Sequence, residues 1–134
     1  MKFFASFALS AALATTAFAQ TISIRAPADG TTVQAGSSIT VEVIQHIFIE
    51  NLEEVALAIG LGAPNLAPAI GGNILYNGPF NPQQQNGVFL QNFTVAIPET
   101  ASTGLMSLNV AHFTLRGSIN TPSIETVNVT LNVV

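Results

Sequence analysis

Residues 127–133 read Val-Asn-Val-Thr-Leu-Asn-Val, an unbroken alternation of apolar and polar side chains. A period of two is the pattern of a β-strand that turns one face to a core and the other to water. The same period recurs through the chain that precedes this stretch, whereas the spacing of an amphipathic helix is hard to find. The sequence therefore predicts an all-β protein.

Six further strands are expected upstream, with turn residues between them. They are predicted at residues 21–25, 38–43, 54–61, 73–76, 88–97 and 105–115. Pro and Gly mark turns at 27–30 and 98–104, and residues 83–87 are predicted as a polar loop. Seven short strands of this kind favour an antiparallel β-sandwich of the immunoglobulin-like or fibronectin-like type. For residues 45–54 the sequence allows two interpretations, an extension of the second strand or a helical turn.

Cysteine is absent from the chain, so the sandwich is expected to hold together without a disulfide. The Trp that packs against the disulfide of antibody domains is missing as well. Stability must then come from packing. The absence of cysteine also excludes thiol catalysis, zinc-thiolate sites and iron–sulfur clusters.

The N-terminus predicts secretion. Met1-Lys2 supplies a short positive region, and residues 3–18 are uncharged and mostly apolar. The run ends in Ala17-Phe18-Ala19, and signal peptidase accepts small residues at the first and third positions before the cut. We therefore expect cleavage between Ala19 and Gln20.

This cut divides the chain into a signal peptide, residues 1–19, and a single β-sandwich domain, residues 20–134. A buried helix of the fold is the alternative for the apolar run. Once Lys2 is removed, Arg25 and Arg116 are the only Lys or Arg residues, against seven acidic ones. Phosphate binding needs clustered cations, so a nucleic-acid partner is disfavoured.

Residues 55–72 carry no charge and could suggest a membrane helix. Pro64, Pro68 and four glycines interrupt the run, and they would break helical hydrogen bonding in lipid. The segment is predicted to be a strand followed by a loop. No membrane insertion of the mature chain is expected.

Two sequons lie on strands. Asn92-Phe93-Thr94 and Asn128-Val129-Thr130 both place the acceptor on the polar phase, where a glycan would project into solvent. We expect N-glycosylation at Asn92, Asn128 or both.

Metal-binding residues are sparse. His46 and Glu50 would share a face if that stretch were helical, but a zinc site needs three or four ligands and His112 lies far along the chain. A loop histidine near solvated acids is the favoured interpretation. The prediction is therefore that the protein has no metal and no cofactor.

No catalytic arrangement stands out either. Glu53 and Glu54 are adjacent and so lie on opposite faces of a strand, which is typical of a solvated strand entry rather than an acid and base pair. His112 shares the phase of Leu108 and Val110, and a hydrogen-bonded histidine at the edge of the core is favoured over a general base. The sequence predicts a protein that is not an enzyme.

One loop is a candidate partner site. It is the run Tyr76, Asn77, Gly78, Pro79, Phe80, Asn81 and Pro82. Turn residues would present two aromatic side chains on a rigid loop, where binding energy tends to concentrate. The alternative is that both rings plug the open end of the sandwich. A carbohydrate ligand is weakly supported, because the chain has no Trp and a single Tyr on which sugars could stack.

Four segments carry a resemblance to a known family. They are Leu75-Tyr76-Asn77-Gly78-Pro79-Phe80-Asn81-Pro82-Gln83, Asn92-Phe93-Thr94-Val95, Leu108-Asn109-Val110-Ala111-His112-Phe113 and Glu125-Thr126-Val127-Asn128-Val129. Together with Ile24 to Val43, they resemble the necrosis-inducing secreted protein family of fungal effectors over essentially the whole mature chain. The string at 76–82 is the most specific part.

The resemblance implies a secreted, non-enzymatic fungal protein. Plant-associated members of that family bind immune receptor kinases and damp pattern-triggered defence, so this is the function that the resemblance implies here, with no catalytic residue to carry over. The alternative is an extracellular fungal cell-wall or carbohydrate-associated module.

Overall fold

The computed structural model describes residues 20–46 and 50–134. This part of the chain forms nine strands and no helix. They are β1 (Ile22–Ala26), β2 (Thr31–Val33), β3 (Ser38–Gln45), β4 (Leu52–Gly62), β5 (Asn73–Gly78), β6 (Gln83–Gln85), β7 (Val88–Ala96), β8 (Gly104–Arg116) and β9 (Thr121–Val133).

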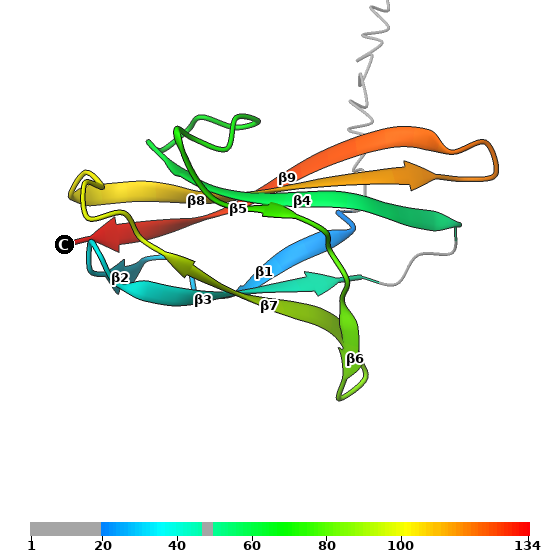
Figure 1. The fold of residues 1–134 in the computed structure, drawn as a ribbon, viewed down its shortest axis with the longest axis horizontal. Helices are drawn as coiled ribbons and strands as arrows, with labels where there is room; N and C mark the ends of the chain where they lie inside the picture. The colour runs from blue at the N-terminus through cyan, green and yellow to red at the C-terminus, as the bar shows by residue number, and fades with distance from the viewer. Residues whose placement is uncertain (1–19, 47–49) are drawn as a thin grey trace, which may run out of the picture.

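The strands form two layers (Figure 1). One sheet has the order β1-β3-β7-β6, and the other has the order β2-β9-β8-β4-β5. All pairs are antiparallel except β2 and β9, which run parallel with Thr31 beside Leu131. The prediction of an all-β sandwich without disulfides is confirmed. Its closer likeness to immunoglobulin or fibronectin domains stays a prediction.

The core lies between the two sheets and follows the predicted alternation. Val41 and Val43 of β3 face Leu108 and Val110 of β8 from the opposite layer, and all four side chains are fully buried. One apolar cluster runs through the inward positions of both sheets. Because the inward apolar side chains of both sheets meet in this cluster, it is what holds the layers together.

Two short strands were not expected from the sequence. β2 follows the predicted turn and pairs with the end of β9. β6 lies within residues 83–87, which were predicted to be a polar loop. That prediction was wrong for Gln83–Gln85, which form a strand. Asn86 and Gly87 have φ values of 50° and 81°, as a two-residue hairpin turn requires, and this turn pairs β6 with β7. An edge strand whose side chains are all in water shows no apolar alternation, so the pattern missed it.

A bulge changes the phase of β4 at its entry. The register of β4 against β8 shifts between Glu54 and Ala56. Val55 is therefore 42% exposed, although in the alternation of the sequence it shares the phase of the buried Leu57. Glu54 instead turns toward the interior. The extra residue of a bulge reverses the faces of the strand on one side of it.

Residues 63–72 fold back over the outer face of the five-stranded sheet, seen as the green loop above β4 and β5 (Figure 1). The Asn109 side-chain amide donates to the Ile70 carbonyl over 3.2 Å. A Cβ on Gly60 would lie 2.3 Å from that same oxygen, so only glycine permits the approach. The predicted strand and loop at residues 55–72 are confirmed. No helix in the described part of the chain is long and apolar enough to cross a membrane.

Candidate functional site

A buried histidine lies at the centre of the candidate site. His112 stands on the inward phase of β8, and its side chain is fully buried. β8 lies between β9 and β4 in the sheet. Each of these neighbours directs one glutamate at the ring, Glu125 from β9 and Glu54 from β4.

Both ring nitrogens of His112 contact carboxylates. Nε2 is paired with Glu54 Oε2, and Nδ1 lies 3.0 Å from Glu125 Oε1. The hydroxyl of Thr21 lies 3.1 Å from Nδ1 as well. Imidazolium is the only form of histidine that donates from both nitrogens, so this geometry fits a positive ring between two negative groups.

The two carboxylates are themselves held in place. The backbone N–H of Thr21 donates to Glu125 Oε2 over 2.8 Å, and the amide of Gln45 donates to Glu54 Oε1. The Phe80 ring meets the His112 ring edge-on, with centroids 5.3 Å apart. The network therefore joins Thr21, the residue before β1, and the end of β3 in one sheet to β4, β8 and β9 in the other.

The surroundings of His112 raise its pKa above 6.5. Burial acts in the opposite direction, because it disfavours the charged ring. Hydrogen bonds to Glu125 and Glu54, together with the negative charges of these two groups, outweigh it. The folded protein thus holds the proton on His112 more tightly than an unfolded chain does.

This raised pKa predicts how stability depends on pH. Since folding raises the pKa of His112, its contribution to the free energy of unfolding is complete below pH 6.5 and is lost as the pH rises through the folded value. We expect the urea midpoint of the protein to fall from pH 6 to pH 9. A His112→Gln variant, which cannot titrate there, should lose this part of the slope. A wild-type midpoint that rises over the same range would contradict the assignment.

The arrangement of His112 suits an internal ion cluster better than a catalytic base. The ring has no exposed surface, and protein groups occupy both nitrogens. The predicted hydrogen-bonded histidine of the core is confirmed. Glu53 is exposed, as a solvated strand entry requires, but the same prediction was wrong for Glu54, because the bulge turns it inward.

His46 and Glu50, which the sequence analysis weighed and disfavoured as metal ligands, gain no third ligand among the described residues. His46 is exposed, with Nε2 3.0 Å from Ser23 Oγ. Residues 47–49, which would decide whether His46 and Glu50 share a helical face, lie outside the described residues. Among residues 20–46 and 50–134, no three His, Asp or Glu side chains are placed to hold a metal ion together.

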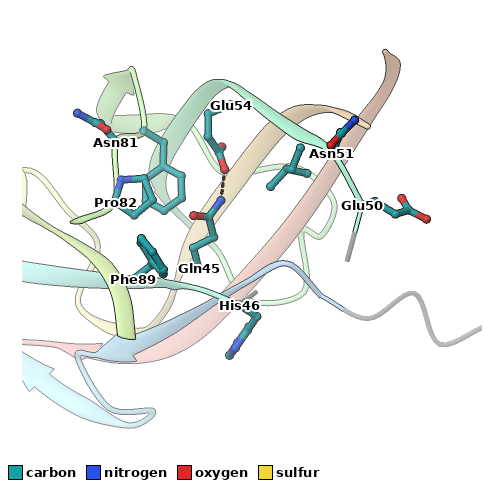
Figure 2. A pocket seen from close by; sticks show the side chains of 10 residues that line it. Gln45, His46, Glu50, Asn51, Glu54, Asn81, Pro82 and Phe89 are labelled. Atoms are coloured by element: carbon teal, nitrogen blue, oxygen red, sulfur yellow. Dashed lines mark hydrogen bonds between the residues drawn. The ribbon is translucent and has the colours of Figure 1, made fainter. Parts of the chain in front are cut away.

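A pocket of about 520 Å³ opens beside Glu54 at this end of the sandwich (Figure 2). Its polar side is formed by the ends of β3 and β4, and its apolar side by Phe89 of β7 and by the segment between β5 and β6. Its described lining is Gln45, His46, Glu50, Asn51, Leu52, Glu54, Phe80, Asn81, Pro82 and Phe89.

The predicted partner loop, residues 76–82, contributes to this pocket with its last three residues. Tyr76 is half-buried, packs on Phe93 at 4.6 Å and donates its hydroxyl to the Pro79 carbonyl over 2.6 Å. Phe80 is only 4% exposed. The plug that the alternative interpretation expected is thus seen for Phe80, whereas Asn77, Pro79 and Asn81 are exposed. Binding by the loop stays a prediction.

The remaining predicted sites lie at the surface or beyond the described residues. Asn92 on β7 and Asn128 on β9 are exposed, one in each sheet. Their glycosylation stays a prediction. Ala19 and the rest of the predicted signal peptide lie outside the described residues, and Gln20 is exposed. Cleavage between Ala19 and Gln20 stays a prediction too.

The sequence contained a signal for one carboxylate of the cluster and none for the other. Glu125 stands on the apolar phase of β9, in step with Val127 and Leu131, which places a charge where an apolar residue is expected. A charge on an inward phase usually has a buried partner. Glu54 gave no such signal, because the bulge that turns it inward is invisible in the alternation.

Comparisons with known proteins cover nearly the whole chain. The model of the Nis1 family matches residues 17–132. A protein named necrosis-inducing secreted protein 1 from Colletotrichum orbiculare is 30% identical over 136 residues, which covers 99% of this chain and 81% of the relative. Its namesake from Colletotrichum higginsianum is 28% identical over 134 residues, covering 99% and 91%.

Among solved structures, a superoxide reductase (neelaredoxin) from Ignicoccus hospitalis and a variant of it are similar to this chain. Both are 12% identical, with TM-scores of 0.45 and 0.47, over 84% of this chain and 81% of the matched chain. A likeness at this level carries no information on activity.

Proposed function

Because this chain belongs to the Nis1 family, we propose that it is a non-enzymatic effector-like protein that binds plant immune receptor kinases and damps pattern-triggered defence. The observation that carries the proposal is the family match over residues 17–132. The two Colletotrichum relatives are named as necrosis-inducing and secreted. The protein is accordingly extracellular.

The site supports binding rather than catalysis. Its one buried histidine has both ring nitrogens held by protein groups, so no lone pair faces the solvent to accept a proton from a substrate. The neighbouring pocket is open to solvent and combines amide, carboxylate and aromatic side chains, which are the groups that fix a partner's orientation. These features suit a rigid recognition surface.

The proposed function is tested by retention of host proteins. The secreted protein is immobilised and exposed to the cytoplasmic domains of plant receptor kinases and, in parallel, to chitin, glucan and cellulose. We expect saturable binding of a kinase domain and no retention of the glycans. Expression in leaves should lower the oxidative burst that a microbial pattern elicits.

Strong glycan retention without kinase binding would overturn the proposal in favour of a cell-wall module. An unchanged oxidative burst together with a bound kinase would remove the defence-damping part alone. A heat-denatured sample of the same protein serves as the control, because binding by the fold disappears when the fold is lost.

A further inference from the structure

The pocket beside Glu54 contains a carboxylate that is fixed before any partner arrives. Gln45 donates to one oxygen of Glu54, and His112 is paired with the other. The Glu54 side chain remains 21% exposed, and it lines the pocket (Figure 2). A carboxylate has about four lone-pair sites, so two contacts leave room for further donors. No side-chain entropy has to be lost to orient this group.

The charge of the pocket is not neutralised from within. Two carboxylates share one histidine, so the cluster keeps at least one net negative charge in either protonation state of His112. Glu50 also lines the pocket and is a second acidic residue there, with its side chain directed away from Glu54 (Figure 2). No Lys or Arg is found among the described residues that line the pocket. Charge complementarity therefore favours a positively charged group as the occupant of the pocket.

The opposite wall is apolar and aromatic. Phe80 forms part of it and is only 4% exposed, and Phe89 and Pro82 stand beside it, half-buried. An aromatic face attracts a cation placed against it, and the carbon stem of a long basic side chain packs on such a surface. The pocket thus offers an apolar lining for a stem and a fixed carboxylate for a charged head.

We propose that this pocket receives a Lys or Arg side chain of a partner protein, with its charged head on Glu54 and its stem against Phe89. The proposal rests on the proposed function, since it names the chemistry by which that function would recognise a partner. Arg fits best, because its planar fork can address the free lone pairs of one carboxylate and stack on a ring.

The test uses peptides as probes of the secreted protein. The ¹⁵N-labelled protein is titrated with Ac-Ala-Arg-Ala-NH₂ and with its citrulline counterpart, which has the same shape without the charge. We expect saturable shifts of the backbone amides of Gln45, Glu54 and Phe89 with the arginine peptide. Binding of the citrulline peptide should be about tenfold weaker or more, the loss of one charge-assisted hydrogen bond.

Two variants localise the effect. Glu54→Gln should abolish the shifts, whereas Glu53→Gln, the same change on the opposite face of β4, should bind as the wild type does. If Glu54→Gln fails to fold, Phe89→Leu replaces it and should weaken binding about two- to fivefold. The proposal is overturned if the citrulline peptide binds equally well, or if a folded Glu54→Gln variant keeps wild-type affinity. Chitohexaose shifting these amides while the arginine peptide does not would also overturn it.

Failure of the pocket and failure of the proposed function give different results. A kinase domain that binds the wild type and the Glu54→Gln variant equally leaves the function standing and removes the pocket from it. An arginine peptide that binds a protein with no affinity for any host kinase leaves the pocket standing and removes the function.

Discussion

Replacing His112 with leucine is expected to lower the free energy of unfolding by about 3–5 kcal/mol at pH 6, the usual cost of removing one partner from a buried ion pair. The variant leaves Glu54 and Glu125 facing an apolar side chain. These carboxylates are only 21% and 15% exposed, so water cannot replace the lost partner fully. Urea denaturation followed by circular dichroism gives the free energy directly.

The matched control is His46→Leu. His46 is exposed, and among the described residues its side chain makes one hydrogen bond, with Ser23, so its loss should change the free energy of unfolding by less than about 0.5 kcal/mol. A His112→Leu variant as stable as this control would mean that the ion cluster is replaceable by apolar packing. The cluster would then help to specify which strands pair and in what register, without adding to the free energy of unfolding.

Replacing Phe80 with alanine, as a separate single variant, is expected to lower the free energy of unfolding by about 3–5 kcal/mol. Phe80 lies in the core cluster, and its ring packs on Phe93 at 6.3 Å and on His112 at 5.3 Å. Truncation leaves a cavity beside the ion cluster, which the rigid strands around it cannot fill. Thermal and urea unfolding measure the loss.

A Phe80→Leu variant separates lost volume from lost ring contacts. It keeps most of the apolar volume and should lose clearly less stability than Phe80→Ala. If Phe80→Ala melts like the wild type and yet loses a partner, then the ring is a binding anchor, as the partner-loop hypothesis held. Loss of stability in the alanine variant assigns the ring to the core.

The sequence predicted the strands well where one face is buried. The alternation at residues 127–133 and at 38–43 reports burial directly, because each inward position must be apolar to enter the core. It failed at β6, where Gln83–Gln85 are exposed on every side and only pairing to β7 makes them a strand. Pairing between strands leaves no trace in the pattern of one strand.

The candidate site was harder to predict for a related reason. His112 could be placed inward from its phase, but its partners come from β4 and β9, 58 and 13 residues away in the chain. Glu54 reaches the ring only because the register shifts after it. A single extra residue in β4 thus decides whether the Glu54 carboxylate faces water or the buried His112. The strand propensities of the residues do not predict where such a bulge falls.

The parallel pairing of β2 with β9 sets the order of events during synthesis. Thr31 lies beside Leu131, so the sheet acquires this edge only after the last strand has been made. At about 5–20 residues per second, the ribosome delays that contact by several seconds. Pairings so distant in sequence also slow the search for the native topology to milliseconds or longer. Residues 31–33 therefore stay outside the sheet until the last residues of β9 are available to pair with them.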